Sequence, residues 1–178
     1  MKKTAIALAL LSTATLASAQ SWRLFPLFTD PNHKLEPTLA ITAGQIKPDG
    51  GTDASNLGLD LSFNCGLIQS PDNRIRSYLQ INRADKDGVK ATQFELSPRY
   101  MVPVSDSLRI GAGPSLTAVS VKRPGQSETL YGAGLAAGLD WRMGAVYAGV
   151  DVRWHDTSKK NDAQFDSTAF GVKLGYNF

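Results

Sequence analysis

The sequence predicts an all-β fold, a closed, antiparallel, up-and-down transmembrane β-barrel of about eight strands. Three observations favour this fold. Apolar and polar side chains alternate with a period of two along most of the chain, which is typical of strands with two different faces. The alternating segments are about ten residues long, the length that crosses a bilayer when a strand is tilted. Aromatic residues gather toward the ends of the apolar stripes, as they do in the girdles at membrane–water interfaces.

The first four predicted strands share this alternation, and turn-forming residues separate them. In the second of them, Leu57, Leu59 and Leu61 lie on one face, with Gly58 and Asp60 on the other. A residue pattern of this kind suits a sheet with an apolar environment on one side only. The four strands cover residues 37–46, 56–65, 74–82 and 93–102.

The last four predicted strands continue the pattern up to the final residue, Phe178, which falls on the apolar face. They cover residues 108–118, 131–142, 146–155 and 167–178. Pro98 and Pro114 fall inside adjacent strands. Because a proline removes one hydrogen-bond donor from the ladder, a bulge or a local irregularity is expected there.

The N-terminal residues 1–19 have the pattern of a secretory signal peptide. Two lysines precede an apolar run, and residues 17–19 form the small-residue cleavage pattern. The apolar run is too short to span a membrane as a helix. We therefore expect cleavage before Gln20, a short periplasmic or interfacial segment over residues 20–34, and a barrel over residues 35–178.

The charge balance and the cysteine count exclude several classes of function. The full chain has 19 basic and 16 acidic residues, and loss of two lysines with the signal peptide leaves 17 against 16, a net charge of +1. This balance gives no basis for nucleic-acid binding. Cys65 is the single cysteine, so no intrachain disulfide is expected. Its position predicts a small apolar side chain that faces lipid near the periplasmic end. No metal-binding or phosphate-binding motif is present, and no cofactor is expected.

The polar face of the predicted strands brings charges of both signs into a narrow lumen. An isolated charge is costly there, so opposite charges are expected to pair. Reflecting the strands about their turns places Glu95 opposite Arg76 and Asp151 near Lys173. We interpret the network as a structural plug, since a barrel of about eight strands is just wide enough for side chains to fill. An ion path or gate is the alternative. The members are Asp60, Arg76, Glu95, Arg99, Arg109, Asp140, Arg142, Asp151, Arg153 and Lys173.

The signal peptide, the alternating strands and the closing residues "GYNF" together resemble the small outer-membrane β-barrels of Gram-negative bacteria, of the OmpA transmembrane-domain and OmpX type. The resemblance covers the whole mature chain and implies a location in the bacterial outer membrane, reached through the periplasm. It also implies that the last strand is the signal read by the barrel-assembly machinery. Lys173 stands where the family often has a glycine. The residues of this signal are Phe170, Val172, Leu174, Tyr176 and Phe178.

The same resemblance implies partners and an orientation. Periplasmic chaperones and the assembly machinery are the expected partners during biogenesis, and outer-membrane lipid and lipopolysaccharide afterwards, with the protein a monomer. Both ends of an even-stranded meander lie on one side, which in this family is periplasmic. The turns over residues 70–73, 103–107 and 143–144 are then periplasmic, and residues 49–53, 85–88, 122–125 and 157–164 face outside. Lys159 and Lys160 in the last of these are candidates for contact with lipopolysaccharide phosphates.

The expected function is that of a non-enzymatic integral outer-membrane protein with an envelope-structural or surface-interaction role. Two alternatives stay open, namely passage of small solutes or hydrophobic molecules, and modification of lipid A. The second needs a catalytic group, and the chain has two histidines, His33 before the first strand and His155. His155 is followed by Asp156 and Ser158, which are ordinary turn residues and match no deacylase pattern. Because a catalytic triad is defined by geometry, no catalytic residue is assigned.

Overall fold

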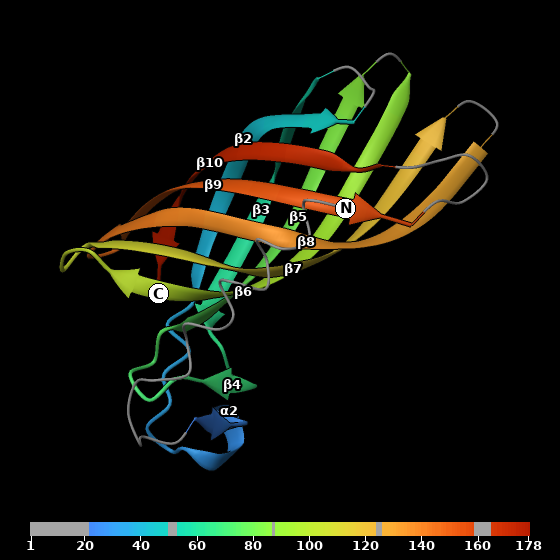
Figure 1. The fold of residues 1–178 in the computed structure, drawn as a ribbon. Helices are drawn as coiled ribbons and strands as arrows, with labels where there is room; N and C mark the ends of the chain where they lie inside the picture. The colour runs from blue at the N-terminus through green and yellow to red at the C-terminus, as the bar shows by residue number, and fades with distance from the viewer. Residues whose placement is uncertain (1–21, 50–52, 87, 124–125, 159–164) are drawn as a thin grey trace, which may run out of the picture.

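The computed structural model describes residues 22–49, 53–86, 88–123, 126–158 and 165–178. Eight strands form a closed barrel in the order β10-β2-β3-β5-β6-β7-β8-β9, drawn in Figure 1. The barrel strands are β2 (Thr38–Pro48), β3 (Ala54–Asn64), β5 (Ile75–Lys86), β6 (Val89–Pro103), β7 (Leu108–Arg123), β8 (Gln126–Met143), β9 (Val146–Thr157) and β10 (Ser167–Asn177). No helix of the described residues has the length and apolar character needed to cross a membrane.

Each neighbouring pair of barrel strands is antiparallel, and β10 closes the barrel by pairing with β2. The predicted fold, an up-and-down antiparallel barrel of eight strands, is thereby confirmed. We call the end where β2 begins and β10 ends the terminus end, and the other the loop end. Both ends of the barrel sequence lie at the terminus end, as expected for an even number of strands.

The β7–β8 hairpin is longer than predicted. β7 and β8 stay paired out to Arg123 and Gln126, whereas β9 accompanies β8 only from Gly132 onward. The predicted strands ended at residue 118 and began again at residue 131, on either side of the expected outward segment over residues 122–125. In the structure, Val119 and Leu130 are fully buried on the inner face of this hairpin, and their burial stabilises the additional residue pairs between β7 and β8.

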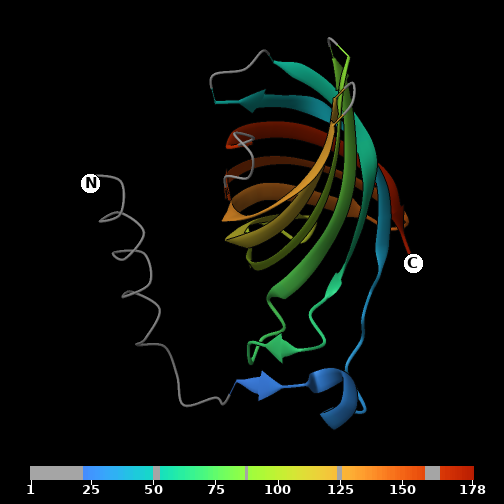
Figure 2. The same cartoon turned by 90° about the vertical axis from the view of Figure 1, so that its right-hand side faces the viewer.

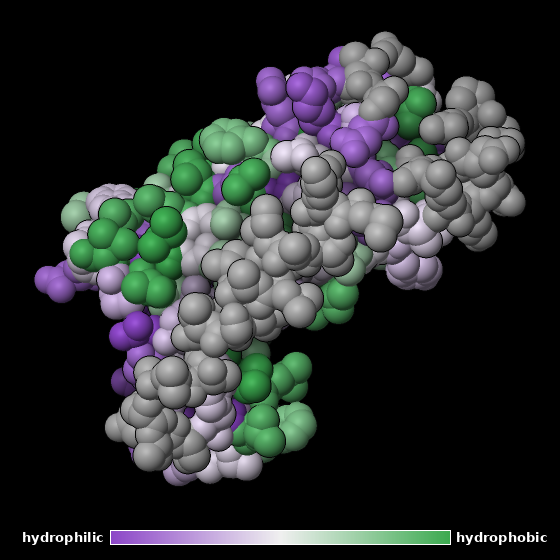
Figure 3. All heavy atoms as spheres, in the orientation of Figure 1, coloured by the Kyte–Doolittle hydropathy of each residue, from purple (hydrophilic) through white to green (hydrophobic). Residues whose placement is uncertain are grey.

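The polarity of the barrel is the reverse of that in a water-soluble protein. Large aliphatic and aromatic side chains cover the outer wall, among them Leu39, Ile41, Leu57, Phe94 and Leu174, while polar and charged side chains fill the interior. Apolar residues cover part of the barrel wall in Figure 3. Such a wall suits lipid, and the closed ladder leaves no unpaired strand edge, which lipid would not solvate.

Aromatic residues mark two levels on the outer wall. Tyr131 and Trp141 both lie on β8, ten positions apart. At 3.3 Å per residue and a tilt of about 40°, this separation corresponds to a height of about 25 Å, which is the thickness of the apolar band on such barrels. Tyr100 and Tyr176 share the terminus-end level with Trp141, whereas Trp154 lies toward the loop end.

The two prolines interrupt the β6–β7 ladder without shifting it. Pairing stops after Leu96–Leu116 and resumes at Tyr100–Ala112 in the same register, so the expected irregularity is present and no residue is inserted. Gly113 lies in this gap, and a Cβ atom there would come within 1.9 Å of the Pro98 carbonyl oxygen. Only glycine permits the two backbones to approach this closely.

An apolar layer closes the interior at the loop end. Val119, Val121, Leu130 and Ala91 form one buried cluster, and a second cluster contains Ile46, Ala84 and Ala169. Phe165 packs against both. The segment with Phe165 is held in place because the Phe165 backbone nitrogen donates to Thr157 Oγ1 and the Thr157 nitrogen donates to Asp166 Oδ1.

A small unit hangs from the terminus end of the barrel, and we call it the foot (residues 22–30 and 65–73; Figures 1 and 2). It contains the two-stranded sheet of β1 (Arg23–Leu24) and β4 (Ile68–Gln69) and the short helix α2 (Pro26–Thr29). The prediction for Cys65 was wrong. The barrel ladder of β3 ends at Asn64, and Cys65 lies buried within the foot with 4% of its surface exposed, so it does not face lipid.

Candidate functional site

The centre of the lumen is occupied by a network of buried charges. Lys173 on β10 lies between two carboxylates, with its Nζ 3.0 Å from Asp60 Oδ2 and 2.7 Å from Asp151 Oδ2. Arg99 Nη2 approaches the same Asp151 oxygen at 3.4 Å. The proximity of Asp151 to Lys173, predicted from the sequence, follows from the β9–β10 register, which pairs Asp151 with Gly171 two residues away.

The predicted pairing of Glu95 with Arg76 was wrong. The β5–β6 turn lies two residues later than predicted, so Gln80 is opposite Glu95 and Arg76 is opposite Arg99. The partner of Glu95 is Arg153, whose Nη1 lies 3.3 Å from Glu95 Oε2. Because the shift between expected and observed partners is an even number of residues, all of these side chains still point inward.

Arg76 has neutral partners near the terminus end. Its guanidinium donates to Asn64 Oδ1 at 3.1 Å, to Thr38 Oγ1 at 3.0 Å and to the backbone oxygens of Glu36 and Ser62. Arg142 also donates to Thr38 Oγ1. The hydroxyl of Thr38 therefore joins two arginines that belong to different sides of the barrel.

Asp140 belongs to a separate group of partners. Tyr78 and Tyr147 donate their hydroxyls to its two carboxylate oxygens at 2.5 Å and 2.8 Å. Tyr78 also joins this group to the central network, because the Arg99 guanidinium lies 4.3 Å from its ring centroid and Lys173 Nζ lies 4.8 Å from it. Neither tyrosine was singled out in the sequence, although both share the inward parity of the charged residues.

The buried charges balance. Four carboxylates and four cations have at most 3% of their surface exposed, namely Asp60, Glu95, Asp140, Asp151, Arg76, Arg99, Arg153 and Lys173. Arg109 and Arg142, the remaining predicted members, are only partly buried and lie at the terminus end. A balanced set of buried charges with mutual hydrogen bonds is a stable way to fill a narrow lumen.

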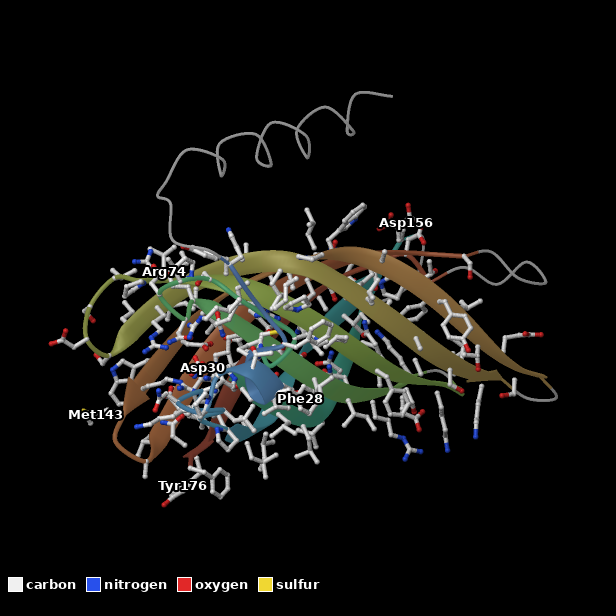
Figure 4. The ribbon with its side chains drawn as sticks, turned by 90° about the horizontal axis from the view of Figure 1, so that it is seen from below. Phe28, Asp30, Arg74, Met143, Asp156 and Tyr176 are labelled. Atoms are coloured by element: carbon white, nitrogen blue, oxygen red, sulfur yellow. The ribbon has the colours of Figure 1, made fainter. Side chains whose placement is uncertain are left out.

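His155 has polar neighbours that its own sequence segment did not indicate. Its Nε2 lies 2.8 Å from Ser115 Oγ and 3.7 Å from Glu95 Oε2, and Gln93 Nε2 lies 3.4 Å from its Nδ1. Asp156, by contrast, points away from the barrel (Figure 4). Ser115 and His155 come from β7 and β9. The one signal in the sequence for this contact is that both residues occupy inward-facing positions of their strands.

The arrangement around His155 does not match a catalytic triad. In a triad the nucleophile and the carboxylate contact different ring nitrogens, so that the carboxylate orients the imidazole. Here Ser115 and Glu95 approach the same nitrogen, and all three side chains are buried inside the barrel. His33 lies in the segment after α2, before the barrel begins. Among the described residues, no group of three or more His, Cys, Asp or Glu is placed to hold a metal ion.

A polar cavity of about 340 Å³ lies at the terminus end, between the barrel and the foot. Lys34, Glu36, Arg74 and Arg109 contribute charges of both signs to its lining. At the loop end, a void of about 10 Å³ lies beside Phe165. None of the eight buried charged residues lines the cavity at the terminus end, and the apolar clusters lie at the other end of the lumen.

The residues of the predicted assembly signal lie together on the outer face of β10. Phe170, Val172, Leu174, Tyr176 and Phe178 are all exposed there, while Lys173 between them points inward. The Phe178 backbone nitrogen donates to the Pro37 oxygen at 2.9 Å, and its ring packs edge-on against Tyr176 with centroids 5.1 Å apart. Lys159 and Lys160 lie outside the described residues, as do residues 50–52, 87 and 124–125 of the other expected outward segments.

No family model and no curated protein matches the sequence. Solved structures match the fold. Neisserial surface protein A matches with a TM-score of 0.56 and 15% identity, covering 80% of this chain and 95% of that one. The attachment invasion locus protein Ail of Yersinia pestis has a TM-score of 0.51 and 15% identity, over 82% and 100% of the two chains. The N-terminal β-barrel domain of Pseudomonas aeruginosa OprF has a TM-score of 0.51 and 14% identity, with the same coverage.

Proposed function

Because this chain has the fold of the small outer-membrane β-barrels, we propose that it is an integral outer-membrane protein that neither conducts solutes nor catalyses a reaction, and that its role is envelope-structural or in surface interaction. The observation that carries this proposal is the balanced charge network in a lumen that an apolar layer closes at the loop end.

Passage of a solute would require the network to open. Lys173 and Arg153 each contact two carboxylates, so a path along the lumen would separate several buried ion pairs at once. Loss of one partner from a buried pair costs about 3–5 kcal/mol. The solute would then meet Val119, Val121 and Leu130 at the loop end. The gate alternative is therefore disfavoured.

Conductance across a planar bilayer tests this proposal. The refolded protein is expected to give no channel steps, and an open porin in the same bilayer is the positive control. An Arg153→Ala/Lys173→Ala variant is a matched comparison that removes two side chains from the plug, and it should also give no steps because the apolar layer at the loop end stays in place. Regular conductance steps from the wild-type protein would contradict the closed lumen.

Modification of lipid A is disfavoured by the position of the histidines. Lipid contacts the outer wall, whereas His155 and Ser115 are enclosed within the barrel. Mass spectra of lipid A from cells with and without the protein should therefore be identical. A mass change that disappears in a His155→Gln variant would support the enzyme and overturn this part of the proposal.

A surface-interaction role is supported by the long β7–β8 hairpin, which extends beyond β9 at the loop end. Two of the similar structures belong to proteins named for a surface location and for attachment. The contact of Lys159 and Lys160 with lipopolysaccharide remains part of the proposal. If it is correct, a Lys159→Gln/Lys160→Gln variant should retain less lipopolysaccharide on purification than a Lys86→Gln/Lys90→Gln variant.

A further inference from the structure

The foot exposes an apolar surface that is large for so small a unit. Phe28 on α2 has 80% of its surface exposed. Figure 3 shows apolar side chains gathered on one side of the foot. The exposed large apolar residues are Trp22, Leu24, Phe25, Leu27, Phe28, Leu67 and Ile68.

Several polar side chains of the foot are partly or fully buried beside Pro26 and Cys65. Arg23 and Asp30 are partly buried, with Arg23 Nη1 2.5 Å from Asp30 Oδ2, and the same guanidinium donates to the exposed Asn73. The buried side chain of Gln69 accepts from the Ile75 backbone nitrogen at 2.7 Å and donates to the Ile75 oxygen at 2.9 Å. A unit in water would bury its phenylalanines and leucines and expose its arginine and aspartate. The foot has the reversed polarity of the barrel wall.

Hydrogen bonds hold the backbone segments that carry these apolar side chains. The Phe25 nitrogen donates to the Leu67 oxygen at 2.7 Å, and the Cys65 nitrogen donates to the Ile75 oxygen at 2.9 Å. Phe25 has a positive φ of 51°, a conformation that is unfavourable for a bulky residue and that here redirects the chain into α2. The hydrogen bonds therefore hold these apolar side chains in exposed positions.

The foot begins at the level of the aromatic girdle. Ile75, to which the foot is bonded, pairs with Tyr100 on the outer wall, and the Arg74 guanidinium lies 6.0 Å from the Tyr100 ring centroid. The outward row of β3 ends at Phe63, and the next position of that row, Cys65, is buried in the foot. The apolar surface of the foot thus continues the lipid-facing wall at the membrane interface.

We propose that the foot is a membrane anchor whose apolar side chains lie among the lipids of the leaflet at the terminus end of the barrel. The occupant of the surface is lipid, because the surface continues a lipid-facing wall and shares its reversed polarity. This inference rests on the proposed membrane location of the barrel. The anchor fixes the tilt and depth of the barrel in the bilayer.

Tryptophan quenching by lipids brominated on their acyl chains tests the anchor in the full-length, refolded protein. Three variants, each with a single tryptophan, are compared. In each variant, every native tryptophan other than the one under test is replaced by phenylalanine. One carries Phe28→Trp on the foot, one keeps Trp154 on the barrel wall, and one carries Asp106→Trp in the β6–β7 turn. The foot tryptophan should be quenched as strongly as Trp154 and be shielded from acrylamide, while position 106 should show the opposite behaviour.

The outcomes separate this inference from the membrane location itself. Absence of quenching at Trp154 would overturn the membrane barrel. Quenching at Trp154 without quenching at position 28 would overturn the anchor alone. If position 28 is then accessible to acrylamide, the foot lies in water, and if it is shielded, a second copy or another protein covers it. A Leu27→Trp protein provides a repeat of the foot measurement should Phe28→Trp fail to refold.

Discussion

At the residue scale, the buried side chains of the lumen depend on their interaction partners and on the space that neighbouring small residues leave for them. Gly138 shows this, because a Cβ atom there would lie 2.8 Å from the Val150 backbone oxygen and 2.9 Å from Arg99 Nη1. The absence of a side chain at this position leaves room for the Arg99 guanidinium. Arg99 in turn contacts the carboxylate of Asp151, which could not remain charged alone in a dry lumen.

The Glu95–Arg153 pair provides a quantitative test at this scale. Glu95→Gln and Arg153→Gln should each lower the free energy of unfolding by about 3–5 kcal/mol, because each leaves a buried charge with fewer partners. Urea unfolding in lipid vesicles measures the loss, and the double variant should recover part of it. Arg76→Gln in place of Arg153→Gln is the matched control, and its effect should add to that of Glu95→Gln. Strong coupling between Glu95 and Arg76 would show that the observed register is wrong.

At the scale of the element, β10 carries two different rows of side chains on its two faces. Its outer face carries the apolar row that ends in Phe178, and its inner face carries Lys173, which contacts Asp60 and Asp151. Alternation keeps the two rows apart, because neighbouring side chains never share a face. The outer row is the predicted signal for assembly. Changes on the outer face should therefore affect delivery, and changes on the inner face should affect stability.

Deletion of Phe178 and the substitution Lys173→Gly separate the effects of the two rows. The deletion removes one interfacial aromatic side chain, so the folded barrel should lose little stability, while the amount that reaches the outer membrane should fall. Lys173→Gly should be delivered normally but unfold at lower urea, since two carboxylates lose their shared cation. Outer-membrane fractions and urea titrations give the two readouts. Wild-type delivery of the deletion variant would contradict the assembly role of Phe178.

At the scale of the whole molecule, the closed ladder and the filled lumen act together. Every barrel strand has two hydrogen-bonded neighbours, so no edge is open to detergent or to another chain. The interior holds balanced charges, the loop end is closed by apolar side chains, and the foot extends the apolar surface at the terminus end. Such a molecule should unfold as one unit.

Heat modifiability should therefore be seen on an SDS gel. The folded barrel, kept at room temperature, should migrate differently from the boiled chain, because SDS does not open a fully paired ladder without heating. Arg153→Ala/Lys173→Ala should lose the folded band at a lower temperature than the wild type. Identical migration before and after boiling would count against the closed barrel.

The alternation in the sequence predicts which face of its strand a side chain occupies. A period of two assigns every residue of a strand to one of two faces, and an error of two or four residues in a turn leaves that assignment unchanged. For this reason the barrel, its apolar wall and the inward position of residues such as Glu95 and Lys173 could be predicted without knowing a single strand pair.

The residues that contact one another across the lumen could not be predicted in the same way. The partner of Glu95 depends on where the β5–β6 turn lies, and Ser115 reaches His155 from another strand across the barrel interior. The foot likewise depends on the pairing of Arg23 with Gln69, from segments far apart in the chain. Contacts of this kind follow from register and barrel closure, which no local pattern encodes, and the same long-range pairing buries Cys65 although its position in the alternation points to lipid.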